Sequence, residues 1–169
     1  MEKYIDLMDL VRLGHEVHQQ NPLSRFLRLT EDLPEQTDEN QVSWSIKGHQ
    51  KPHGPALVKL SITANPRLQC QRCMKLFNYD VASEVELQIV TSERAFNADV
   101  SESGEIDNDA YEKILANKPV DMLALVEDEL ILSLPYIPKH DICPELAEMP
   151  EDNLEKKPSP FAVLEKLKH

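Results

Sequence analysis

Glycine is scarce in this sequence, with four residues in 169. None of the four stands in a G-x-G-x-x-G or Walker arrangement, so the common glycine-rich phosphate-binding loops are excluded. The sequence also lacks any motif that pairs a serine or cysteine nucleophile with a histidine base. The chemistry of the chain therefore favours a binding module, and we expect no enzymatic activity.

Cysteines and long apolar runs are also few. Three cysteines, an odd number, argue against a disulfide scaffold. No apolar run approaches the roughly 20 residues that a membrane-spanning helix needs. The start, Met1-Glu2-Lys3-Tyr4, does not have the basic-then-apolar layout of a secretory signal. We therefore expect a cytoplasmic protein without a membrane partner, and the sequence leaves its oligomeric state open.

Basic residues are outnumbered, 18 against 30 acidic ones, which gives a formal charge of -12. Nucleic-acid affinity comes largely from Lys and Arg that neutralise phosphates, so any RNA contact requires a local basic patch. The overall field attracts basic partners instead, among which ribosomal proteins are candidates. The region from Glu93 to Glu112 is the most acidic and is expected to be a solvated loop, with a short strand near Tyr111–Leu115.

Two strand-like segments between Leu57 and Val90 organise the chain, and they join at Cys70-Gln71-Arg72-Cys73. Apolar side chains alternate with polar ones on both sides of this turn, as in strands with one face on a core and one in water. Such sheets are usually antiparallel. The pattern predicts a long hairpin with the cysteine pair at its tip.

The remaining elements predict an α+β fold: an antiparallel sheet packed by N-terminal helices and by one helix in the C-terminal half. Residues 1–34 are predicted to be helical, with Asn21-Pro22 starting a second helix. Residues 42–47 alternate as a strand, 48–55 form a loop, and 120–134 form a helix with a buried stripe. We expect one domain over 1–137. The tail, 138–169, is proline-rich and ends in a short docking helix with Phe161 and Leu164 on one face.

Three neighbouring carboxylates, Glu127, Asp128 and Glu129, lie in the middle of the predicted helix. Successive residues point about 100° apart around a helix, so the three cannot converge on one ion. They are expected to form a solvated or partner-facing edge that attracts basic protein. The basic residues concentrate elsewhere, around the hairpin turn, where Arg67, Gln71, Arg72 and Lys75 could contact RNA or a ribosomal partner, with Arg25 and Arg28 as candidate neighbours.

The pair Cys70 and Cys73 has the spacing of half a structural zinc site. His140 and Cys143 could supply the other two ligands and tie the tail to the hairpin tip. The favoured interpretation, however, is that the two cysteines of the turn are reduced thiols without a metal, so no cofactor is expected. A thiol-redox role is a third interpretation, although both flanks of the motif are predicted strands, whereas a thioredoxin-like motif opens a helix.

Three segments resemble one family: Leu68 to Cys73 (LQCQRC), Val120 to Pro135 (VDMLALVEDELILSLP) and Pro158 to Leu164 (PSPFAVL). Their order and spacing are similar to those of the YceD family of large ribosomal RNA subunit accumulation proteins. The resemblance implies a cytoplasmic, non-enzymatic factor in ribosome biogenesis that supports synthesis, processing or accumulation of large-subunit (23S) ribosomal RNA. The resemblance implies no molecular mechanism, but this role and the charge balance together lead us to expect a large-subunit ribosomal protein or pre-ribosomal RNA as the partner.

Overall fold

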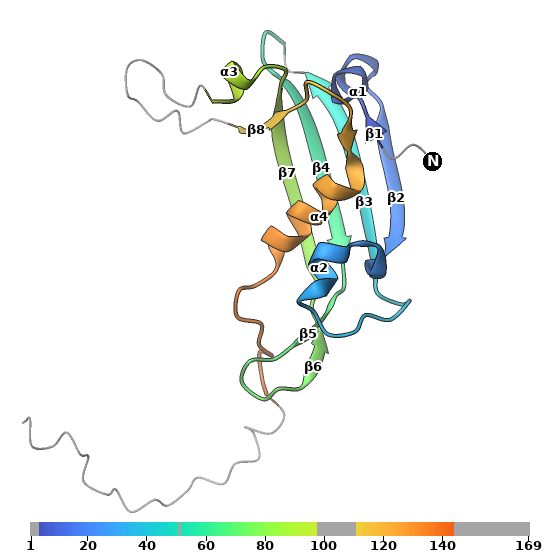
Figure 1. Ribbon diagram of the computed structural model, residues 1–169, viewed down its shortest axis with the longest axis vertical. Helices are drawn as coiled ribbons and strands as arrows, with labels where there is room; N and C mark the ends of the chain where they lie inside the picture. Colours follow the sequence, from blue (N-terminus) through green and yellow to red (C-terminus); the bar gives the residue numbers. More distant parts are fainter. Residues whose placement is uncertain (1–3, 51, 98–110, 144–169) are drawn as a thin grey trace, which may run out of the picture.

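The computed structural model describes residues 4–50, 52–97 and 111–143 (Figure 1). Its centre is a five-stranded sheet in the order β2-β3-β4-β7-β8. All neighbouring pairs are antiparallel except β7 and β8, which are parallel. The strands are β2 (Glu16–Pro22), β3 (Gln41–Gln50), β4 (Ala56–Ala64), β7 (Val81–Val90) and β8 (Glu112–Leu115). The predicted α+β class and the mostly antiparallel sheet are confirmed.

Helices α1 (Leu7–Leu13), α2 (Leu27–Glu31) and α4 (Met122–Ser133) pack on one face of this sheet (Figure 1). Side chains of the three helices form one core with alternate residues of β3, β4 and β7. The predicted stripe of α4 is confirmed at Val126 and Leu130, which are fully buried. Asp121 caps this helix, because its side chain accepts the N–H of Leu123 at 3.1 Å.

Smaller elements complete the described part of the chain. A 3-10 turn (Leu23–Arg25) precedes α2, and α3 (Glu93–Phe96) follows β7. Strand β1 (Tyr4–Ile5) pairs with β9 (Val120–Asp121) in a two-stranded sheet. The predicted strand near residues 111–115 is confirmed as β8. None of the helices in the described ranges is long and apolar enough to cross a membrane.

The central hairpin is confirmed, but it is divided into two parts. After β4 and before β7, the short strands β5 (Arg67–Gln69) and β6 (Leu76–Asn78) pair as a sheet of their own. The N–H of Tyr79 donates to the carbonyl of Pro66 at 2.9 Å where the two parts meet. This small sheet lies at one end of the molecule's long axis, and α3 lies at the other (Figure 1). The cysteine turn is therefore held away from the main core.

The prediction of an all-helical N-terminus is wrong. Glu16–Pro22 forms the edge strand β2, and Asn21-Pro22 ends this strand instead of starting a helix. Pairing with β3 outweighs the weak helical pattern of this segment. The buried side chain of Asn21 has a hydrogen-bond partner, because its Oδ1 accepts the indole N–H of Trp44 at 2.9 Å. The predicted loop after residue 47 also begins late, because β3 continues to Gln50.

Candidate metal-ligating site at the hairpin tip

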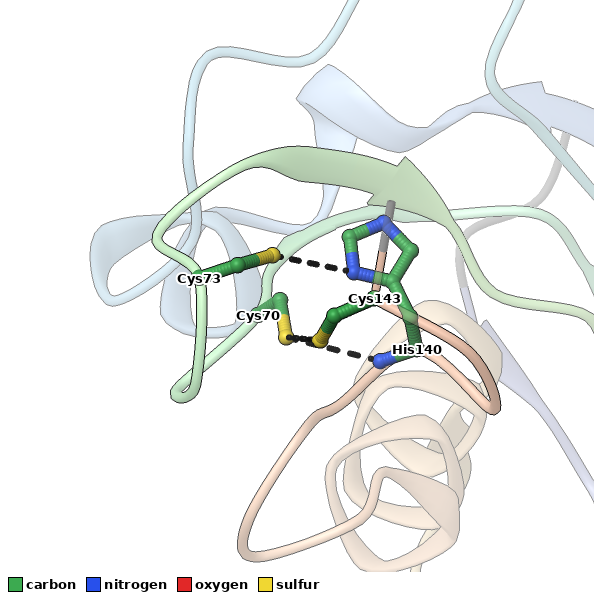
Figure 2. A group of neighbouring side chains, drawn as sticks. All are labelled: Cys70, Cys73, His140 and Cys143. Carbon is green, nitrogen blue, oxygen red and sulfur yellow. Dashed lines mark hydrogen bonds between the residues drawn. The ribbon is translucent and has the colours of Figure 1, made fainter. Parts of the chain in front are cut away.

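The turn between β5 and β6 is built by local backbone hydrogen bonds. The N–H of Cys70 donates to the carbonyl of Lys75, and the N–H of Met74 donates to the carbonyl of Cys70, both at 2.9 Å. Met74 adopts a left-handed conformation with φ of 61°, which closes the turn tightly. As a result, the side chains of Cys70 and Cys73 point toward the same side (Figure 2).

The segment that follows α4 returns to this turn. The carbonyl of Pro138 accepts the N–H of Gln71 at 2.9 Å. The guanidinium of Arg72 donates to the carbonyls of His140 and Asp141. Two neighbouring residues of the turn thus fix the backbone of residues 138–141, about 70 positions later in the chain.

Four side chains that carry metal-ligand atoms converge between the two segments (Figure 2). The Sγ atoms of Cys70, Cys73 and Cys143 and a ring nitrogen of His140 all lie within 4.8 Å of one another. Cys70 Sγ lies 3.7 Å from Cys143 Sγ, and Cys73 Sγ lies 3.4 Å from His140 Nδ1. Three sulfurs and one imidazole nitrogen form a donor set that suits thiophilic metals.

The surroundings hold these side chains in place. The rings of His140 and Phe77 lie 4.6 Å apart at 39°, so a residue of β6 supports the imidazole. The backbone N–H of His140 lies 3.5 Å from Cys70 Sγ. Cys70 and Cys143 are buried, whereas Cys73 and His140 are half-buried.

The three thiols are not electrostatically equivalent. Burial raises the pKa of Cys70, but the backbone N–H groups of Cys73, His140 and Arg72 together outweigh it and lower this pKa to about 5. Burial and hydrogen bonds with Cys70 and Cys73 raise the pKa of Cys143 to about 11. The surroundings thus favour a thiolate at Cys70 and a neutral thiol at Cys143.

The residues predicted to form the contact surface of the tip differ in their exposure and in their contacts. Gln71, Arg72 and Lys75 are exposed. Arg67 is half-buried, and its backbone bonds twice to the side chain of Gln36 at 2.9 Å. Arg28, expected as a neighbour of the tip, lies instead beside α4, where its guanidinium pairs with Glu127 and Asp128 at 2.9 and 2.7 Å.

The expected solvated edge of α4 is wrong for Glu127, whose residue is 8% exposed. Its carboxylate accepts the N–H groups of Arg28 and Leu29 and the guanidinium of Arg28. Glu129 accepts the hydroxyl of Ser83 at 2.6 Å, and only Asp128 remains largely exposed. The docking residues Phe161 and Leu164 lie outside the described residues.

Comparisons with known proteins identify the family. A family model described as "Large ribosomal RNA subunit accumulation protein YceD" matches residues 58–168. The chain belongs to the YceD family. A curated YceD, the large ribosomal RNA subunit accumulation protein of Haemophilus influenzae, is 33% identical over 151 residues, which are 83% of this chain and 80% of the relative. No solved structure gives a significant match.

The match to the YceD family confirms the resemblance drawn from the sequence motifs. The matched region begins in β4 and includes the hairpin tip, α4 and both halves of the four-residue cluster. Strands β2 and β3 and helices α1 and α2 precede it, although they pack into the same core. The four candidate ligands thus lie in the part of the chain that the family model matches.

Sequence reasoning missed the apolar side chains that border the candidate ligands. Met74, next to Cys73, is 59% exposed, and Ile142, next to Cys143, is 78% exposed. Leu76 at the start of β6 is also exposed. Met74 and Ile142 lie in connecting segments, which run over the protein surface, and this is the signal that could have indicated their exposure.

Proposed function

We propose that this YceD-family chain is a non-enzymatic ribosome biogenesis factor of the cytoplasm that supports accumulation of large-subunit ribosomal RNA. It acts by binding a large-subunit ribosomal protein or pre-ribosomal RNA. The family match and the name of the Haemophilus influenzae relative support the role. The observation that supports the binding mode is the hairpin tip, where Gln71, Arg72 and Lys75 are exposed on a turn that a second segment holds in place.

Charge favours a protein as the main partner. With a formal charge of -12, most of the surface repels a phosphate backbone and attracts basic proteins. Exposed Met74, Leu76 and Ile142 add apolar area to the two segments that form the tip. Exposed apolar side chains beside basic ones are typical of protein-binding surfaces, and Arg72 and Lys75 can also reach phosphates.

Affinity purification of the tagged chain from growing cells tests this proposal. We expect ribosomal proteins of the large subunit, precursor 23S RNA or pre-subunits to be enriched over a control. An RNase treatment before elution separates a protein partner from an RNA partner. Absence of all three classes would exclude the proposed function.

Charge reversal at the tip tests the binding surface. The variant Lys75→Glu is expected to reduce the enrichment several-fold, because it replaces an exposed cation with an anion and leaves the bonds of Arg72 to His140 and Asp141 in place. The matched control is Lys118→Glu, which makes the same change at an exposed position after β8. Equal enrichment of the two variants would exclude the tip as the contact.

The alternative, a thiol-redox protein, needs a thiol that a substrate disulfide can reach. The sulfur atoms of Cys70 and Cys143 lie 3.7 Å apart, but both residues are buried. Cys73 is half-buried. Turnover of a disulfide substrate by the purified chain, lost in Cys73→Ser, would support this alternative over the binding function.

A further inference from the structure

We propose that Cys70, Cys73, His140 and Cys143 bind one Zn²⁺ ion in a closed structural site that joins the hairpin tip to the segment after α4. This inference is independent of the proposed function, because it rests on the ligating atoms alone. It concerns how the tip is held, whatever the tip contacts.

The distances within the cluster fit a zinc tetrahedron. With Zn–S bonds of about 2.3 Å and Zn–N bonds of about 2.0 Å, a regular tetrahedron separates two sulfurs by about 3.8 Å and a sulfur from a nitrogen by about 3.5 Å. The observed separations are 3.7 Å for Cys70 and Cys143 and 3.4 Å for Cys73 and His140 Nδ1. A disulfide would need its sulfurs about 2.05 Å apart. These two separations thus match those of ligands around an ion, and all four ligand atoms lie within 4.8 Å of one another.

The turn also resembles a metal-binding turn in its construction. Two cysteines three positions apart direct their sulfurs to one side, and Met74, immediately after them, takes the left-handed conformation that lets the chain reverse. The N–H of His140 lies 3.5 Å from Cys70 Sγ, which is the kind of donor that stabilises a ligating thiolate. The Phe77 ring and the bonds from Arg72 fix the position of His140.

The number and burial of the ligands favour a structural role. Four protein ligands leave no coordination position for a substrate or an activated water, unlike a catalytic zinc site. Cys70 and Cys143 are 0% and 2% exposed. Three thiolates and an imidazole in a tetrahedral arrangement favour Zn²⁺ over the oxygen-preferring Mg²⁺ and Ca²⁺.

The fold explains why such a link is useful. Strands β5 and β6 have three residues each and form a two-stranded sheet, which is marginal on its own in water. The segment after α4 contributes His140 and Cys143 from about 70 positions away. An ion that joins the two closes a long loop and holds exposed Arg72 and Lys75 in one orientation.

Elemental analysis of the full chain tests the inference. The chain is purified from cells without added metal and without chelator, and zinc is measured by plasma mass spectrometry. We expect about one zinc per chain, lost in Cys73→Ser and in His140→Ala. His18→Ala, an exposed histidine on β2, is the matched control and should keep the metal. His140→Cys should also keep it, because a fourth thiolate can replace the imidazole.

Two further measurements cover variants that fold poorly. Replacement of zinc by Co²⁺ in the unaltered chain should give the intense visible absorption of a tetrahedral site together with sulfur-to-cobalt charge transfer. Loss of zinc should lower Tm by roughly 5–10 °C. Any one of three results would overturn the proposal. They are a zinc-free chain with three freely titrating thiols, a disulfide between Cys70 and Cys143, and stoichiometric iron in place of zinc. Retention of zinc in His140→Ala would overturn the ligand set.

Discussion

The carboxylate of Glu127 accepts the backbone N–H of Arg28 at 2.8 Å and its side-chain Nε at 2.9 Å, although the two residues are 99 positions apart. The same carboxylate accepts the N–H of Leu29 at 3.2 Å. Glu127 on α4 therefore provides acceptors for the first turn of α2, where the first N–H groups of a helix have no partner within the helix. This contact joins the N-terminal part of the chain to the helix of the C-terminal half.

Replacing Glu127 with Ala should lower the free energy of unfolding by about 2–3 kcal/mol, because it leaves a buried N–H group without an acceptor. Urea unfolding measures this loss. Asp128→Ala is the matched control. It removes only the largely exposed partner of Arg28 and should cost less than about 1 kcal/mol. Equal losses in the two variants would contradict a structural role specific to Glu127.

Gly48 permits the close approach of β3 to α1. A Cβ at this position would lie 2.5 Å from both the carbonyl carbon of Leu10 and the nitrogen of Val11, which are backbone atoms that cannot rotate away. Gly48→Ala should therefore lower the free energy of unfolding by about 1–3 kcal/mol. Ser43→Ala, at an exposed position of the same strand, should change it by less than about 0.5 kcal/mol. A neutral Gly48→Ala would show that α1 does not pack this closely.

Trp44 reports on its own buried hydrogen bond, because it is the single tryptophan of the chain. Asn21→Ala removes the acceptor of the indole N–H and should cost about 1–3 kcal/mol in unfolding free energy. The fluorescence maximum should shift as the indole changes partner. Gln20→Ala, exposed on the same strand, should leave both measurements unchanged. An unshifted emission in Asn21→Ala would contradict the bond.

Removal of the proposed zinc should affect the tip before the core. The small sheet β5-β6 is separate from the five-stranded sheet that buries Trp44. After treatment with a strong chelator, limited proteolysis should cut between residues 66 and 80 or within 134–143, while the Trp44 emission stays native. Simultaneous loss of the Trp44 signal would show that the site supports the whole fold, and unchanged proteolysis would indicate that the tip does not depend on a metal.

The sequence predicted the elements whose pattern is local. Alternation through β4 and β7 was clear because Val58, Leu60 and Ile62 all face the core, and the stripe of α4 was clear at Val126 and Leu130. Strand β2 was missed because its core-facing positions are Val17, Gln19 and Asn21, so its pattern is mostly polar. Segment 16–22 forms a strand because it pairs with β3 and because Asn21 accepts the indole N–H of Trp44.

Residues of the candidate site were predictable as a set, but their arrangement was not. The spacing of Cys70 and Cys73 indicated two ligands, and the sequence suggested His140 and Cys143 as the others. Their approach depends on Arg72 and Gln71, which bind backbone carbonyls of the second segment, and no periodic pattern reports such contacts. The burial of Glu127 was equally hidden, because its charge partner Arg28 lies in a distant helix.

The elongated arrangement in Figure 1 places the α3 end far from the β5-β6 end. The α3 end is therefore a suitable point at which to immobilise the protein. A biotin or dye coupled near Arg94 in α3 would leave the cysteine-bearing end oriented outward from a sensor surface. Binding kinetics recorded in that orientation would sample the tip without steric interference from the support, and the reverse attachment would mask it.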